Sequence, residues 1–161
     1  MADRRPDLEV AERVKAVCPD FTPERVIART SKSRLVRGRL AGQQVVAKVV
    51  VSDAPVWHWL LRREIALYHG FATSAPPVRT PRYITADPDR SVLVVEHLDG
   101  RRLASGRHVG GSLGRDVVAA LLAALDALMG WDRLHESAGH PVCRDLESDR
   151  ELLQDAVPGS R

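Results

Sequence analysis

The sequence has no asparagine, three lysines and two cysteines among its 161 residues. Cys18 and Cys143 have neither the spacing of a zinc site nor the number needed for a disulfide framework, so we expect a reducing compartment. Aromatic residues make up only 4% of the chain, and its 24 basic residues are spread among 21 acids. A nucleic-acid surface needs clustered positive charge and stacking aromatics, so we expect no nucleic-acid partner.

Long hydrophobic runs are also absent. The longest apolar stretch, from Val117 to Met129, is interrupted by Asp126 and is too short to span a bilayer. The first nine residues mix acids and bases and no apolar segment follows them, so no signal peptide is expected. A hydrophobic content of 44% is enough for a globular core. We therefore expect a cytoplasmic protein without a membrane partner.

Hydrophobic periodicity predicts a helix from Leu8 to Val17 and then a change to strands. Three strands are expected at residues 25–29, 34–40 and 44–51, the last two joined by the tight Ala41-Gly42 turn. Two more, at 82–86 and 91–96, should form a hairpin.

Three later helices are predicted. The first follows the third strand, with Asp53 as a capping acid ahead of Pro55, and ends at Gly70. The second runs from Arg115 to Met129 and is closed by Gly130, and its apolar stripe is interpreted as core. A last, weaker helix is expected at residues 145–156.

Lys48 places a charge inside an otherwise apolar strand, residues 45–51. Glu64 projects to the middle of the apolar stripe of the next helix, so it should face inward, toward the lysine. An ammonium among valines needs a carboxylate or a phosphate to offset several kcal/mol of desolvation. Two alternatives remain open: Lys48 as an edge-strand residue whose ammonium reaches water, and Glu64 as an exposed acid of a shorter helix.

Three segments together resemble the aminoglycoside phosphotransferase family of the protein-kinase-like superfamily: Val45-Val46-Ala47-Lys48-Val49-Val50, Arg62-Arg63-Glu64-Ile65-Ala66-Leu67-Tyr68 and Val92-Leu93-Val94-Val95-Glu96-His97-Leu98-Asp99-Gly100. The resemblance covers roughly residues 24–135. It implies an α+β fold: a kinase-like N-lobe, with an antiparallel sheet of about five strands and one helix packed on it, then a partial helical C-lobe. The implied division is an N-terminal helix at 1–20, the N-lobe at 21–98, and the hinge with a truncated C-lobe segment at 99–161.

The same resemblance implies a site for Mg-ATP. Lys48 would reach the α/β-phosphates and Glu64 would orient it, while backbone groups of Glu96 and Leu98 would bind adenine at the hinge. Ser31 and Ser33 belong to the segment 30–33, which takes the place of the phosphate-covering loop but has no glycine. These serines are equally well explained as turn formers. Lys32 would add a second positive charge.

Catalysis in this family needs an H-x-D-x-x-x-x-N loop and a further metal-binding aspartate. The sequence has no asparagine, so we identify neither catalytic residues nor metal ligands. We expect a truncated or degenerate small-molecule phosphotransferase that binds ATP without transferring its γ-phosphate to a small-molecule hydroxyl. The alternative is a non-catalytic interaction protein or structural remnant, self-associating through the surface that would face a C-lobe.

Overall fold

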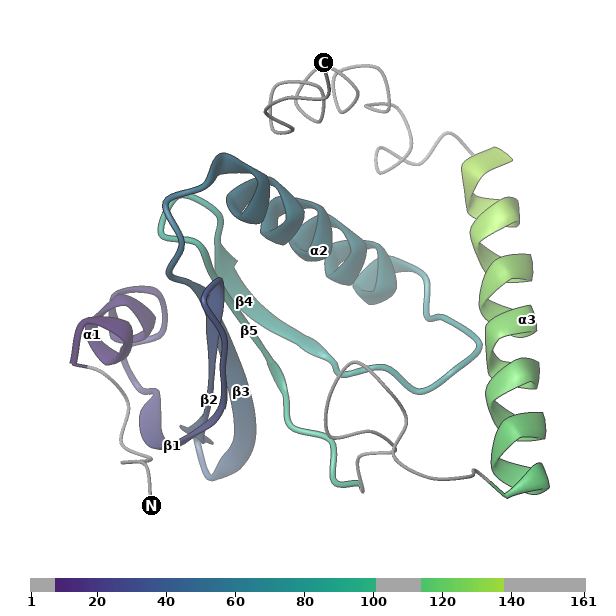
Figure 1. Cartoon of the computed structure of the whole chain (residues 1–161), viewed down its shortest axis with the longest axis horizontal. Coiled ribbons are helices and arrows are strands. Elements are labelled where there is room, and N and C mark those ends of the chain that lie inside the picture. The colour runs from purple at the N-terminus through teal and green to yellow at the C-terminus, as the bar shows by residue number, and fades with distance from the viewer. Residues whose placement is uncertain (1–7, 101–113, 138–161) are drawn as a thin grey trace, which may run out of the picture.

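The computed structural model describes residues 8–100 and 114–137 and contains a five-stranded antiparallel sheet with helices packed on it (Figure 1). The α+β class and the antiparallel sheet of about five strands are those expected. The helix predicted at 145–156 lies outside the described residues. In chain order the elements are α1 (Leu8–Val17), β1 (Thr22–Arg29), β2 (Ser33–Leu40), β3 (Gln43–Val50), α2 (Pro55–Thr73), β4 (Tyr83–Asp87), β5 (Val92–Glu96) and α3 (Arg115–Ser137).

The sheet has the strand order β1-β2-β3-β5-β4, which places β3 at its centre. Lys48 of β3 lies opposite Leu35 of β2 on one side and Leu93 of β5 on the other. The interpretation of Lys48 as an edge-strand residue is therefore wrong. Between β2 and β3, Ala41 and Gly42 both have positive φ, 48° and 82°, as a two-residue hairpin turn requires.

One face of the sheet is sealed by α1. Val45, Ala47 and Val49 alternate along β3 and point to this face, where Val10 and Val14 of α1 meet them. Successive side chains of a strand point to opposite faces, so only every second residue of β3 joins this core. Phe21 completes it and is 1% exposed. Its ring lies so close to Gly38 that a Cβ at Gly38 would be 2.6 Å from the phenyl Cζ.

The opposite face is only partly covered. Helix α2 packs on β3, β5 and β4, where Leu61 and Ile65 meet Val50 and Leu93. Toward β1 and β2 the same face carries the half-buried residues Ala28, Leu35 and Val46. The two faces thus differ in how completely their apolar surface is covered.

The ends of α2 differ from the prediction. Its N-cap is Ala54, which makes no side-chain capping hydrogen bond, so the capping role given to Asp53 is wrong. Pro55 begins the helix without an N–H group, which removes one donor that a cap would satisfy. The helix also continues three residues past Gly70, because a glycine inside a helix costs only about 1 kcal/mol. Its last residue is Thr73, and the Gly70 carbonyl accepts both the Thr73 hydroxyl, at 2.9 Å, and the N–H of the C-cap Ser74.

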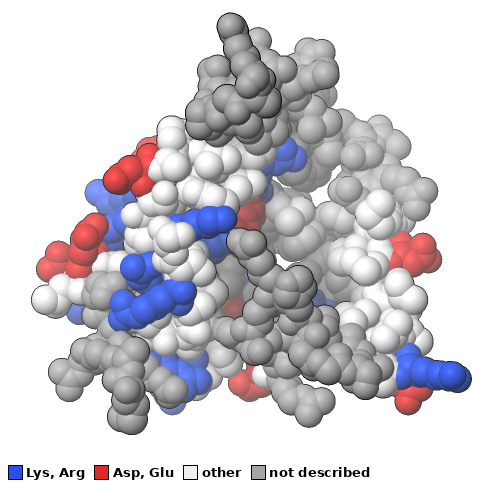
Figure 2. Space-filling view, in the orientation of Figure 1, with Lys and Arg blue, Asp and Glu red and all other residues white. Residues whose placement is uncertain are grey.

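Helix α3 passes through Gly130 to Ser137, so the predicted end at Gly130 is wrong as well. Its apolar stripe is exposed, in contrast to the core role predicted for it. In Figure 2 most of the visible surface of α3 is white, between charged groups. No helix within the described ranges is long and apolar enough to cross a membrane. The exposed stripe consists of Val118, Leu121, Leu122, Leu125 and Met129, whose exposed fractions run from 39% to 61%.

Candidate functional site

Lys48 and Glu64 form the ion pair suggested by their sequence positions, with the lysine Nζ donating to Glu64 Oε2. The pair joins the central strand to α2. Each side chain is about one-third exposed, 33% for Lys48 and 31% for Glu64, so the lysine is not enclosed by valines. A pair this accessible contributes only about 0–1 kcal/mol to stability. Beside it, burial and the Glu64 charge raise the pKa of the Tyr68 phenol, which keeps Tyr68 neutral.

The pair stands beside a cavity of about 250 Å³. The cavity lies between the β1–β2 loop, strand β3 and the N-terminal half of α2. Its wall contains two lysines, one from the loop and one from the strand. The lining residues are Thr30, Lys32, Ser33, Lys48, Val50, Trp57, Leu60 and Leu61.

The β1–β2 loop is closed by its own hydrogen bonds. Thr30 Oγ1 accepts from the backbone N–H groups of Lys32 and Ser33, at 3.1 and 3.0 Å. The Thr30 N–H in turn donates to the Ser33 carbonyl at 3.0 Å. Phosphate-binding loops present free backbone N–H groups to the anion, and here two of those groups already have partners. Recognition of an anion at this loop therefore relies less on backbone N–H groups than it does in a glycine-rich loop.

The two loop serines are placed differently. Ser33 lines the cavity, with its hydroxyl 3.4 Å from Thr30 Oγ1. Ser31 is exposed and does not line it. Of the residues predicted for the phosphate site, the fold therefore gathers Lys48, Glu64 and Ser33 and leaves Ser31 outside.

Lys32 extends over Trp57 of α2, with its Nζ 3.6 Å from the ring centroid. Its carbonyl accepts from the N–H of Val51, at 2.9 Å, just past the end of β3. The loop is thus attached both to the sheet and to the helix. The sequence patterns did not identify Trp57 as a site residue.

The predicted hinge residues lie at the far end of β5. Glu96 pairs with Val45, donates its N–H to the Arg82 carbonyl at 2.9 Å and accepts from the Arg82 N–H at 3.2 Å. Leu98 is half-buried, and its backbone groups make no hydrogen bond within the described residues. Glu96 is three residues beyond Leu93, the partner of Lys48, which is about 10 Å along the strand. Neither Glu96 nor Leu98 lines the cavity of Lys48.

A second, more polar cavity of about 340 Å³ opens at this end of the sheet. Two acids, Glu96 and Asp99, and the base Arg82 contribute to its wall. The lining residues are Gln43, Gln44, Arg82, Glu96, His97 and Asp99.

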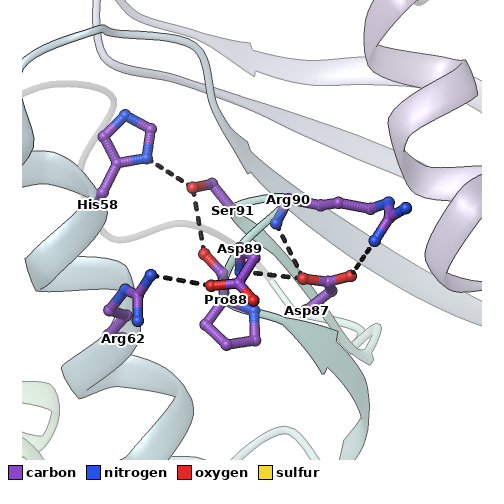
Figure 3. A network of polar contacts seen from close by, with 7 residues as sticks. All are labelled: His58, Arg62, Asp87, Pro88, Asp89, Arg90 and Ser91. Atoms are coloured by element: carbon purple, nitrogen blue, oxygen red, sulfur yellow. Dashed lines mark hydrogen bonds and ion pairs between the residues drawn. The ribbon is translucent and has the colours of Figure 1, made fainter.

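Helix α2 is held in place by a network that sequence reasoning did not find (Figure 3). His58 Nε2 lies 2.7 Å from the carbonyl oxygen of Ser52, and its Nδ1 lies 2.5 Å from Ser91 Oγ. A carbonyl can only accept, so Nε2 carries the hydrogen of the bond to Ser52, and the Ser91 hydroxyl in turn donates to the Pro88 carbonyl at 3.5 Å. Ser91 is 2% exposed and has a φ of 54°. These bonds join the helix to the residue just before β5.

One turn further along α2, Arg62 pairs with Asp89 of the β4–β5 turn at 3.0 Å (Figure 3). Asp87 organises that turn by accepting from the N–H groups of Arg90 and Asp89, at 2.8 and 2.9 Å. These bonds and the Arg90 guanidinium lower the pKa of the Asp87 carboxyl. The helix bearing Glu64 is therefore anchored to the β4–β5 turn as well as to Lys48.

No protein-family model matches the sequence. No curated protein matches it either. A comparison with solved structures finds similarity to the chain in the gentamicin-APH(2")-IIa complex, with a TM-score of 0.48 and 17% sequence identity. The similarity covers 61% of the present chain and 30% of that chain.

Proposed function

We propose that this chain binds an adenine nucleotide, as Mg-ATP or ADP, on the face of the sheet that carries Lys48. The observation that carries the proposal is the Lys48–Glu64 ion pair, on the central strand beside a cavity. A partly exposed ion pair adds little stability, so a role in binding explains its position better than a role in folding. In this arrangement Lys48 contacts the phosphates and Glu64 orients it.

An apolar platform lies between Lys48 and the end of β5. Val46 is two residues from Lys48 on the same face of β3, next to its β5 partner Val95. Leu35 lies opposite Lys48 on β2. All three are half-buried, which leaves apolar surface for a flat base. The Glu96 N–H is already bonded to Arg82, so the Glu96 carbonyl and the backbone groups of Leu98 would hold the edge of the adenine at the end of this platform.

Phosphotransfer requires more than this site. Kinase-like enzymes use an aspartate to position the acceptor hydroxyl, and an asparagine and an aspartate to hold Mg²⁺. The 161 residues contain no asparagine, so we propose that this chain alone binds nucleotide but does not transfer phosphate to a small molecule.

Thermal denaturation with added Mg-ATP or ADP tests the nucleotide site. The wild type and Lys15→Ala, a control lysine on the exposed side of α1, should show a saturable rise in melting temperature. Lys48→Ala should remain folded and show no rise. An equal rise in Lys48→Ala would remove the phosphate role of Lys48, and no rise in folded wild type would remove the nucleotide site.

The exposed stripe of α3 favours a second candidate, a kinase-like interaction module that self-associates. Five large apolar side chains on one helix, all at least 39% exposed, form a surface that water solvates poorly. Sedimentation velocity over a range of concentrations tests it. The wild type should associate and Leu122→Glu should not, while a wild type that stays monomeric at high concentration would exclude this candidate.

A further inference from the structure

Lys32 is a second lysine in the cavity wall, and it comes from the β1–β2 loop. We propose that Lys32 is a phosphate-binding residue that rests on the Trp57 ring until the phosphate chain of a bound nucleotide replaces the ring. The site then prefers nucleoside di- and triphosphates to monophosphates. This inference rests on the proposed nucleotide function and adds a specificity to it.

The balance of charge at the cavity supports this role. Glu64 already compensates Lys48, so their pair brings little net charge to an anionic ligand. Lys32 pairs with no carboxylate within the described residues, and its ammonium faces an aromatic ring instead. Arg34 directs a guanidinium NH group to the Thr30 carbonyl but does not line the cavity. Lys32 is therefore the positive charge that remains available to a polyphosphate.

The hydrogen bonds within the β1–β2 loop also support a phosphate-binding role for Lys32. Thr30 occupies the N–H groups of Lys32 and Ser33, which a glycine-rich loop would offer to phosphate. A positive side chain on the same loop replaces that lost interaction. Only the Lys32 side chain has to move, because its carbonyl stays bound to the Val51 N–H.

Movement of the Lys32 ammonium from the Trp57 ring to a phosphate is energetically favourable. A cation on a partly solvated aromatic face is held weakly, whereas a bond between ammonium and phosphate joins two full charges and is considerably stronger. The flexible stem of lysine allows its ammonium to change partners without a change in the backbone. Departure of the cation alters the environment of the Trp57 indole, so Trp57 fluorescence reports the exchange directly.

Calorimetric titration with adenosine, AMP and ADP tests the proposal. Four proteins are compared: the wild type, Lys32→Gln, Lys32→Arg and the control Lys15→Gln. We expect Lys32→Gln to weaken ADP binding at least tenfold and to leave adenosine binding unchanged, so that the preference for ADP over AMP collapses. Lys32→Arg should restore most of that preference, which a merely structural role of the lysine would not predict.

Fluorescence provides the second readout. In a protein whose only tryptophan is Trp57, with Trp59→Phe and Trp131→Phe, ADP should change the emission, and Lys32→Gln should abolish the change. If Lys32→Gln and Lys15→Gln bind ADP equally well and with the same emission change, this inference is overturned and the nucleotide site stands. If the folded wild type binds neither adenosine nor ADP, both this inference and the proposed nucleotide function are overturned.

Discussion

The two faces of the sheet differ in what the central strand β3 presents on each of them. Val45, Ala47 and Val49 of β3 enter a sealed core beneath α1, in which every residue is 9% exposed or less. On the other side, Lys48 separates Val46 from Val50 and pairs with a carboxylate of α2 beside a cavity. The fully apolar face holds most of the buried core, and the face with the ion pair is the one on which we propose the nucleotide site.

The unequal size of the two cores supports this division. Among the residues that the structure describes, eleven buried residues form the core under α1 and four form the core under α2. Burial of apolar surface is the dominant favourable term in folding, so the α1 face carries most of the stability. The α2 face then tolerates a charged pair and a cavity. Substitutions on the two faces should accordingly separate stability from binding.

The largest effect is expected for Phe21→Ala on the α1 face. Phe21 is 1% exposed, and removal of a buried phenyl ring costs about 3–5 kcal/mol of unfolding free energy. Urea denaturation measures the loss. The matched control on the other face is Leu60→Ala, since Leu60 is 41% exposed and should cost far less. Equal losses for the two variants would contradict the division of roles.

His58→Ala should have the next largest effect, because it removes both bonds that join α2 to Ser52 and Ser91. Each hydrogen bond is worth about 0.5–1.5 kcal/mol net, and without His58 the Ser91 hydroxyl keeps only its longer bond to the Pro88 carbonyl, at 3.5 Å. Urea denaturation of His58→Ala beside Arg62→Ala tests this order. The exposed Arg62–Asp89 pair is worth about 0–1 kcal/mol, so a larger loss in Arg62→Ala would show that the ion pair is the stronger anchor.

Much of this arrangement follows from sequence alone, and the reasons are local. Alternation of apolar residues located the strands, and the register of Glu64 in its helix indicated its pairing with Lys48. The contact of Lys32 with Trp57 joins residues 25 positions apart, and that of His58 with Ser91 joins residues 33 apart. No periodic pattern encodes such contacts, because they depend on how loops and turns are placed by the completed sheet.

The errors have equally specific causes. The stripe of α3 shows that the helix is amphipathic, but a stripe does not say what covers it, and within the described residues it is exposed. Asp53 has the chemistry of a cap, yet the helix begins at Pro55 with Ala54 as the N-cap. Gly130 has the chemistry of a helix end, yet α3 continues through it. Boundary residues are weak signals because packing decides where a helix ends.

A smaller effect on stability is expected for Lys48→Met. The pair is about one-third exposed, so water can solvate Glu64 once its partner is gone, and the unfolding free energy should change by less than about 1 kcal/mol. Binding of ADP should nevertheless be lost. Urea denaturation measures the change in stability, and calorimetric titration measures ADP binding. A large loss of stability with ADP binding retained would show that the Lys48–Glu64 pair is structural.

The smallest effect is expected for Asp87→Ala, and it should depend on pH. The pKa of Asp87 is lowered in the folded protein, so its carboxylate stabilises the fold above its unfolded pKa of about 3.9. That contribution is lost as the pH falls through the folded pKa. Melting temperatures of the variant and wild type should therefore differ at pH 7 and converge once the pH has fallen below the folded pKa of Asp87. A difference that grows on acidification would contradict this sign.

The most direct test of the central claim is a methyl NMR titration of the valine-labelled protein with ADP, because neighbouring valines of β3 report opposite faces of the sheet. The account predicts saturable shifts at Val46 and Val50, on the face of Lys48, with Val45 and Val49 unchanged. Lys48→Met should abolish these shifts. Shifts confined to Val45 and Val49, or none at saturating ADP, would contradict a nucleotide site on the α2 face.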